Sequence, residues 1–379
     1  MYSTSSSTLS LASSPLSAMA ALPSHSASHL FLAASSSATS SNSLSLLLFD
    51  EARNALEEVQ GYRLPDASRM VLSARALADE AEDGGASVLL VTKSNVPGAP
   101  DYRAEAYTIP RVTSTVEAFE AESSPASVAD ITLARASSVA PSEGSPVTCF
   151  VPAPSSTTKP YLLGTPSSLH LLSPSFEVAS TYALSDSFSH VTSLASPHTP
   201  NSIVSLVGPS LLHVDPRDPN PSSLFPSAHD HGVTCLDFNP NRPAFIATGG
   251  KDGHARLWDL RTTKQALEGP ALQLSGHSHW LTNVEFNPSH DQLLLTTSSD
   301  TTVALSLLSS VSSSPLLALA DSPRPPPLDH RVSIHEGHGA PVVGAAWSAS
   351  DAWCWATADE SGEVIVDHVA SEEKYKILL

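Results

Sequence analysis

Between His277 and Asp300, short apolar runs are separated by polar turn residues. The first run contains three apolar positions at close spacing, Leu281, Val284 and Phe286. Asn287 to Ser289 interrupt it, and Leu293 to Thr297 begin a second run. Runs of this length, bounded by Asn, Pro and Ser, are typical of β-strands. The stretch therefore predicts two strands joined by a turn.

The same ladder of positions occurs twice more in the chain. One copy lies earlier in the chain. Its residues His229, Val233, Leu236, Phe238, Thr248 and Asp252 have the same mutual spacing as His277, Leu281, Val284, Phe286, Thr296 and Asp300. A third copy contains His338, Val342, Ala345, Trp347 and Thr357, with Ser361 in the place of the aspartate. Matching internal spacing predicts a repeat protein with clear repeats at 227–270, 271–311 and 336–379.

The part of the chain before residue 227 shows weaker copies of this pattern. Short apolar runs alternate with Ser, Pro and Thr turns, and one unit ends in Asp215-Pro216-Arg217 where the next ends in Asp259-Leu260-Arg261. At the usual ~40–55 residues per repeat, this part holds about four further units, which gives about seven in all. A Pro-rich insertion at 312–330 reads as an exposed loop, because proline removes hydrogen-bond donors from a strand. The repeat array is expected over 29–379.

The Ser-rich segment 1–28 allows two interpretations. It is either a disordered tail or the source of a strand that closes the array beside Val364 to Val366 of the last repeat. A targeting peptide is not expected, because the basic residues of secretory and mitochondrial leaders are missing before Arg53.

Charge and cysteine content narrow the classes of partner. The chain has 379 residues, with 19 Lys and Arg against 38 Asp and Glu, a formal charge of -19. Such an excess of negative charge repels phosphate backbones and anionic lipid, so we expect neither nucleic-acid binding nor direct binding to a membrane surface. No apolar run approaches the ~18–20 residues of a spanning helix, so we expect no direct membrane insertion. The three separated cysteines, Cys149, Cys235 and Cys354, are typical of free thiols in a reducing compartment.

The best repeat ends with Asp252-Gly253 and, five residues on, Trp258-Asp259. This run resembles the WD40 family, and the resemblance implies a hydrogen-bonded tetrad of His229, Thr248, Asp252 and Trp258 within one blade. Linking a buried indole N–H, an imidazole and a carboxylate gives each of them a partner. The other two repeats keep partial tetrads only, His277, Thr296 and Asp300 in one and His338 and Thr357 in the other, because Ser306-Leu307 and Asp367-His368 replace Trp-Asp. The expected fold is an all-β, seven-bladed WD40 β-propeller with a degenerate N-terminal half.

The sequence contains no convincing catalytic or metal-binding motif. His335-Glu336-Gly337-His338 lacks the i, i+4 histidines of a helical HExxH site and precedes a predicted strand. Neither a nucleophile elbow nor a phosphate-binding loop is present. We therefore expect no enzyme activity, no cofactor and no metal.

Five residues near the blade starts are candidates for protein binding: Lys251, His279, Trp280, Ser299 and Glu360. Trp280 precedes a predicted strand, at a position where loop residues of a propeller face solvent. Its ring either anchors a partner or packs on the neighbouring blade, and the sequence leaves both open.

The stretch from His277 to Asp300 also resembles one blade of the EARP and GARP complex-interacting protein family. The shared features are the H-S-H-W start, the S-H-D-Q-L continuation and a chain end of the K-Y-x-I-L-L type at Lys374 to Leu379. The resemblance implies a scaffold that binds the GARP and EARP tethering complexes in endosome-to-Golgi transport and endocytic recycling. It further implies a monomeric propeller within a larger complex, cytoplasmic and peripheral at the trans-Golgi network and endosomes. Another WD40 adaptor, such as a ubiquitin-ligase substrate receptor or a chromatin reader, is the alternative, since the fold serves many partners.

Overall fold

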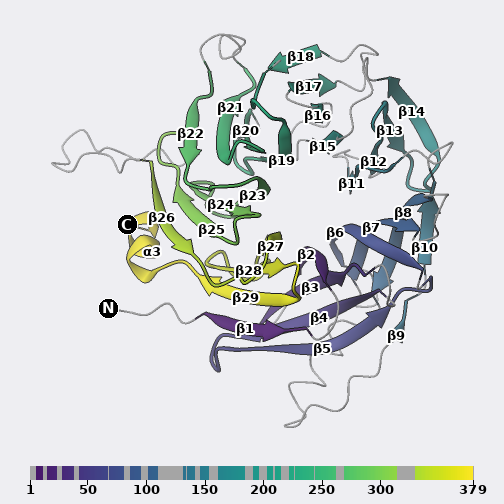
Figure 1. The fold of residues 1–379 in the computed structure, drawn as a ribbon, viewed down its shortest axis with the longest axis horizontal. Helices are drawn as coiled ribbons and strands as arrows, with labels where there is room; N and C mark the ends of the chain where they lie inside the picture. Colours follow the sequence, from purple (N-terminus) through teal and green to yellow (C-terminus); the bar gives the residue numbers. More distant parts are fainter. Residues whose placement is uncertain are drawn as a thin grey trace. The chain divides into compact units, whose positions relative to one another are not determined.

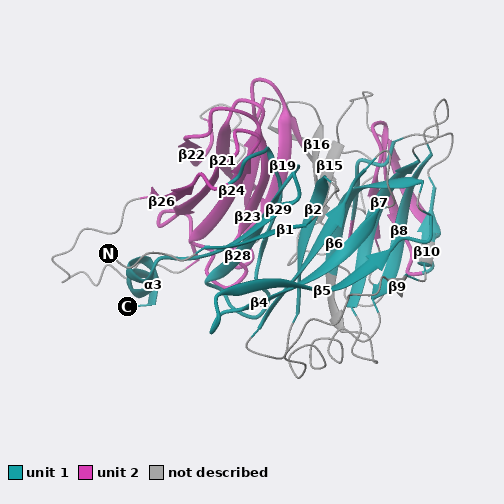
Figure 2. Ribbon diagram, turned by 60° about the horizontal axis from the view of Figure 1, so that its bottom comes forward, with its two compact units in different colours: residues 1–150, 175–177, 338–379 teal, residues 151–174, 178–337 magenta. Residues whose placement is uncertain are grey.

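The structure is a computed structural model of the 379-residue chain. It describes residues 6–11, 15–23, 28–37, 42–66, 68–80, 86–94, 101–109, 131–133, 135–140, 146–152, 161–183, 191–195, 203–207, 210–214, 222–225, 227–242, 244–261, 269–313 and 329–378. Most of these residues lie in β-strands, and the chain divides into two compact units (Figure 2). Unit 1 contains residues 1–150, 175–177 and 338–379, and unit 2 contains residues 151–174 and 178–337.

Unit 1 contains three sheets and a C-terminal helix (Figure 1). The first sheet has β2 (Leu16–Leu22), β3 (His29–Ser35), β4 (Ser43–Asp50), β5 (Ala55–Arg63) and β9 (Ile131–Thr132). The second has β6 (Arg69–Glu80), β7 (Ala86–Ser94), β8 (Tyr102–Ile109) and β10 (Arg135–Val139). The third has β1 (Ser7–Ser10), β27 (Val342–Trp347), β28 (Cys354–Asp359) and β29 (Glu363–His368), and helix α3 (Ser371–Leu378) follows.

Four further sheets hold most of unit 2 (Figure 1). The first has β11 (Cys149–Pro152), β12 (Tyr161–Gly164), β13 (Ser168–Leu172) and β14 (Val178–Ala183). The second has β15 (Val191–Ala195), β16 (Ile203–Val207), β17 (Ser210–Val214) and β18 (Ser222–Phe225). The next is β19 (Val233–Phe238), β20 (Phe245–Gly250), β21 (His254–Asp259) and β22 (Leu272–Ser275). The last is β23 (Leu281–Phe286), β24 (Leu293–Ser298), β25 (Val303–Leu307) and β26 (His330–His335).

The apolar ladder seen in the sequence explains where the strands form. In β19, Val233, Leu236 and Phe238 are buried, whereas Thr234 and Asp237 are partly exposed. The adjacent β20 is buried along its whole length, as expected for an inner strand covered on both faces. β23 and β24 repeat this arrangement, so the two predicted strands and their turn are present as predicted.

All described strand pairings are antiparallel except that of β5 with β9. Four-stranded antiparallel sheets that follow one another along the chain are the blades of a β-propeller. The predicted all-β propeller is therefore confirmed. The predicted count of seven blades is not confirmed. The structure describes side chains along six of the sheets, and in the remaining sheet, β15–β18, it describes those of Ser210 and Leu211 only.

The N-terminal segment contributes strands to two different sheets. β1 pairs with β29, with Leu9 opposite Val364 and Ser7 opposite Val366. β2 instead pairs with β3 in the first sheet. Residues 1–28 therefore include two strands, one of which lies beside the residues that the sequence analysis named as a closing edge.

Two other sequence predictions concern the Pro-rich insertion and membrane insertion. Most of the Pro-rich insertion, residues 314–328, lies outside the described residues. Among the helices that the structure describes, none is long and apolar enough to cross a membrane.

Candidate functional site

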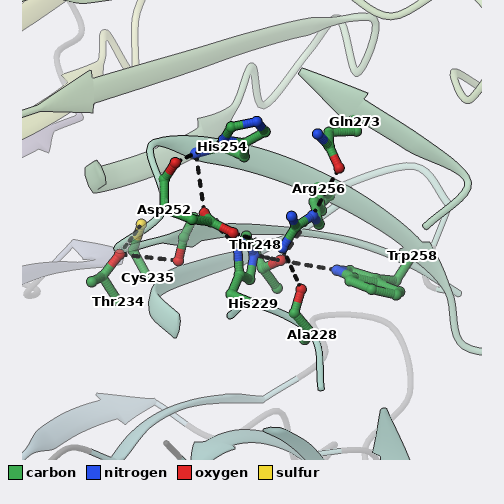
Figure 3. Close-up of polar contacts among 11 residues, drawn as sticks. Ala228, His229, Thr234, Cys235, Thr248, Asp252, His254, Arg256, Trp258 and Gln273 are labelled. Atoms are coloured by element: carbon green, nitrogen blue, oxygen red, sulfur yellow. Dashed lines mark hydrogen bonds and ion pairs between the residues drawn. The ribbon is translucent and has the colours of Figure 1, made fainter. Parts of the chain in front are cut away.

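Four side chains of the sheet β19–β22 form a continuous chain of hydrogen bonds (Figure 3). The Nε1–H of Trp258 donates to Thr248 Oγ1 at 2.9 Å. Thr248 Oγ1 lies 2.9 Å from His229 Nε2, and His229 Nδ1 lies 2.9 Å from Asp252 Oδ1. Three of the four are buried, with His229 and Thr248 at 0% exposure and Trp258 at 3%. The structure thus brings together the four residues named as a tetrad.

The direction of each hydrogen bond follows from the partners. A carboxylate only accepts hydrogen bonds, so the His229 proton sits on Nδ1, facing Asp252. Nε2 is then an acceptor for the Thr248 hydroxyl, which in turn accepts from the indole. Arg256 adds an ion pair to Asp252, with 2.8 Å between Nη1 and Oδ2. Every polar group of this hydrogen-bond network therefore has a partner, and the network joins β20, β21 and the turn between them to the segment before β19.

Burial and hydrogen bonding set the charge of this network. Burial lowers the pKa of His229, although Asp252 opposes the shift. Burial works against the ionised form of Asp252 as well, but the hydrogen bond from His229 and the charge of Arg256 outweigh it and hold the Asp252 pKa below its ordinary value. The stable form is thus a neutral imidazole beside a carboxylate.

Gly253 permits the tight turn between β20 and β21. Its φ of +76° lies in the left-handed region, and a Cβ there would lie 2.7 Å from the carbonyl oxygen of His277. The Asp252-Gly253 pair thus places the carboxylate at the tetrad and lets the backbone of the next repeat approach closely.

The repeat beginning at His277 keeps part of this network. His277 Nε2 lies 2.9 Å from Thr296 Oγ1, and its Nδ1 lies 3.0 Å from Thr302 Oγ1. Thr302 also donates to Asp300, whose own distance to His277 Nδ1 is 3.4 Å. Ser306 stands opposite Leu294 where Trp258 stands opposite Ile246 in the preceding sheet. The hydroxyl of Thr302, which the sequence analysis did not single out, thus links the histidine to the aspartate.

The third repeat has its aspartate at a different position from the one that the spacing suggests. His338 Nε2 lies 2.8 Å from Thr357 Oγ1, and its Nδ1 lies 3.3 Å from Asp359 Oδ2. Ser361, which occupies the expected aspartate position, donates to Asp359 instead. Residues two apart in a strand point to the same face, so Asp359 lies on the same side of β28 as Thr357. The third repeat therefore has a carboxylate that the spacing rule missed.

Glu363 approaches the same group, and His338, Asp359 and Glu363 offer potential ligand atoms within 4.8 Å of one another. The hydrogen bonds of His338 to Thr357 and Asp359, and of Asp359 to Ser361 and the Glu363 N–H, already account for this arrangement.

A surface cluster of four side chains lies in unit 2 beside the start of β23. Trp280 is 47% exposed. The Lys251 ammonium lies 5.0 Å from the centre of its ring, and the His279 ring stacks against it with 5.2 Å between centroids. Ser299 hydrogen-bonds to His279 Nδ1 and to the Trp280 carbonyl. We call these four residues the Trp280 cluster. Lys251 comes from the neighbouring sheet, so the ring both packs on that sheet and faces solvent.

Lys251, Ser299 and Glu360 occupy equivalent places in their repeats. Each backbone N–H donates to the carbonyl of the residue before a first strand, namely that of Gly232, Trp280 and Pro341, at 2.9, 3.0 and 3.0 Å. Glu360 is exposed and belongs to unit 1, whereas the Trp280 cluster belongs to unit 2.

The exposed cluster and the complete tetrad both lie in a segment with known counterparts. Residues 173–306 match the family model of the EIPR1 beta-propeller. The resemblance carried by residues 277–300 is thereby confirmed. Relatives include "EARP-interacting protein 1" of Caenorhabditis elegans, 36% identical over 192 residues, which are 48% of this chain and 52% of that protein.

Two vertebrate proteins are also similar to this chain. "EARP and GARP complex-interacting protein 1" of Homo sapiens is 34% identical over 167 residues, and "EARP-interacting protein homolog" of Gekko japonicus is 36% identical over the same length. Each match covers 40% of this chain and 42% of the relative. The chain thus matches about half the length, or somewhat less, of these curated relatives.

Proposed function

We propose that the chain is a non-enzymatic propeller adaptor that binds the GARP and EARP vesicle-tethering complexes. The support is the family match over residues 173–306 and the names of the relatives, which describe interaction with these complexes. Through them it would serve endosome-to-Golgi retrograde transport and endocytic recycling. We further propose that the protein is cytoplasmic and peripheral at the trans-Golgi network and endosomes. Within the larger complex it would be a monomeric propeller of seven blades.

The Trp280 cluster is the proposed contact surface. Large aromatic side chains anchor protein interfaces because they bury much area for few rotatable bonds. Lys251 and the stacked His279 hold the indole in place before a partner arrives, which lowers the entropy lost on binding. An exposed, pre-positioned tryptophan inside the family-matched segment is the single observation that carries this assignment.

The three histidine networks have the complementary role of supporting the strands. Their groups face one another and are largely buried, so they hold the sheets and leave binding to the surface. We assign His229, Thr248, Asp252 and Trp258 to this structural role, with His277, Thr296, Asp300, His338 and Thr357 in the partial networks.

Affinity purification of the tagged chain from cells tests the function. We expect subunits of the tethering complexes to co-purify with the wild type and to be depleted with Trp280→Ala. Val178→Ala is the matched control, because Val178 is an exposed apolar side chain of the same unit, 54% exposed. Recovery of ubiquitin-ligase or histone components in place of tether subunits would favour the alternative adaptors.

A further inference from the structure

Three potential metal ligands from separate parts of the chain meet in unit 1. His29 begins β3, Glu51 follows β4, and Asp351 lies in the turn between β27 and β28. One ring nitrogen of His29 and one carboxylate oxygen from each acid lie within 4.8 Å of one another. Some point in space is therefore within about 2.8 Å of all three atoms, and zinc binds such donors at about 2.0–2.2 Å. Side-chain shifts of less than about 1 Å would complete the coordination.

One ring nitrogen of His29 is buried and unsatisfied within the described part of the chain. Its side chain belongs to a residue only 2% exposed, and Nδ1 lies 2.8 Å from Ser348 Oγ and 3.2 Å from Ser350 Oγ. Its Nε2 is buried and has no hydrogen-bond partner among the residues that the structure describes. Leaving such an atom unsatisfied is costly, so an occupant that uses its lone pair is favoured. A histidine held through one nitrogen, with the other free, has the usual arrangement of a metal ligand.

The surroundings of His29 contain two further buried donors. His368 also has a buried Nε2 without a partner in the described part of the chain. The Phe49 ring contacts both imidazoles, with centroid distances of 5.6 Å to His29 and 5.4 Å to His368. Cys354 stands opposite His368 across β28 and β29. These two side chains lie outside the group whose ligand atoms are within 4.8 Å of one another, so they surround the site and are not offered as ligands.

Glu51 and Asp351 place negative charge on this whole group. Burial lowers the pKa of His29 and of His368, and the charge of Lys374 lowers that of His368 further, whereas both acids oppose these shifts. Burial raises the pKa of the Cys354 thiol, and the same two acids raise it further. Within the described residues, neither carboxylate forms an ion pair. Two carboxylates near an electron-rich imidazole, with no cation paired to them, form a place where a cation is electrostatically stabilised.

We propose that His29, Glu51 and Asp351 bind one divalent transition-metal ion of the zinc class. His29 supplies the nitrogen through Nε2, and the carboxylates supply two oxygens. A mixed nitrogen and oxygen donor set suits zinc, whereas calcium and magnesium take oxygen ligands. The ion connects the first sheet of the chain to the last, as the bond from His29 to Ser348, 319 residues apart, does without metal. The sequence did not indicate the site, because its ligands are far apart and no motif joins them.

Zinc titration of the metal-free full-length chain, followed by isothermal calorimetry and by metal analysis after gel filtration, tests the proposal. We expect one zinc ion per chain and a rise in the thermal unfolding midpoint on addition of zinc. Glu51→Gln is the decisive variant, because Glu51 is exposed and its replacement leaves the core intact. We expect it to weaken zinc binding at least tenfold, as loss of a direct ligand should. His29→Gln should abolish the thermal shift.

Glu57→Gln is the matched control, since Glu57 is an exposed acid of β5 in the same sheet. It should bind zinc as the wild type does. The proposal is overturned if the wild type binds no zinc, or if Glu51→Gln binds it with unchanged affinity. It is equally overturned if binding is lost in Asp359→Asn but kept in Glu51→Gln, because the ion would then lie at His338, Asp359 and Glu363.

Discussion

Replacing Trp258 tests how far one tetrad stabilises its sheet. The side chain is 3% exposed, and its indole donates to Thr248. Removing the ring returns about 150–250 Å² of buried area, worth ~4–6 kcal/mol at ~25 cal/mol/Å² as an upper bound. Measured losses for Trp or Phe to Ala in cores are about 3–5 kcal/mol. We therefore expect Trp258→Ala to lower the free energy of unfolding by about 3–5 kcal/mol.

Two further variants separate the ring from its hydrogen bond. Trp258→Phe keeps most of the apolar area but removes the N–H donor, so we expect a loss of about 1–2 kcal/mol. His277→Ala removes an imidazole, smaller than an indole, from a network that has no tryptophan, and it should cost less than Trp258→Ala. The order Trp258→Ala, then the two milder variants, is the outcome that the geometry requires.

Urea unfolding followed by far-UV circular dichroism measures these losses. The midpoint should shift most for Trp258→Ala, while the slope of the transition stays that of the wild type. Equal and near-zero losses for Trp258→Ala and His277→Ala would refute the assignment of the tetrad.

Three other outcomes follow from the structure. Gly250→Ala should destabilise the fold, because its Cβ would overlap His229 Nδ1, whereas Gly339→Ala, with no described atom within 4 Å of the new Cβ, should be tolerated; thermal melts of both variants compare them. Burial lowers the pKa of all three network histidines, so below about pH 6.5 the unfolded state binds more protons, and the urea midpoint should fall between pH 7 and pH 5; a rise would contradict this. Deleting residues 2–11 removes the strand paired with β29 and should lower the melting midpoint by several degrees, while an unchanged midpoint would show that this pairing contributes little.

The parts of the fold that the sequence predicted are those with a strict spacing. A His before the first strand, a Thr in the second, an Asp in the following turn and a Trp in the third must sit at fixed offsets to be hydrogen-bonded, so the network around Trp258 was visible as a pattern. The role of Asp359 was not predicted, because this aspartate lies at the end of a strand, two positions before the turn position that carries the aspartate in the other repeats.

Other features leave little trace in a single sequence. β1 consists of Ser7–Ser10, small neutral residues whose pairing depends on β29 at the other end of the chain. The cluster of His29, Glu51 and Asp351 likewise arises only when the first and last sheets of unit 1 are folded. For Trp280, the position before a strand left open whether the ring anchors a partner or packs on the neighbouring blade, and the contact with Lys251 of another sheet needed the structure.

Direct binding of the purified chain to purified EARP and GARP complexes tests the central claim. Biolayer interferometry with the immobilised complex would report the affinity without other cellular proteins. We predict saturable binding by the wild type and at least tenfold weaker binding by Trp280→Ala, with unchanged melting temperature. Absence of binding by the folded wild-type chain to either complex would contradict the proposed adaptor function.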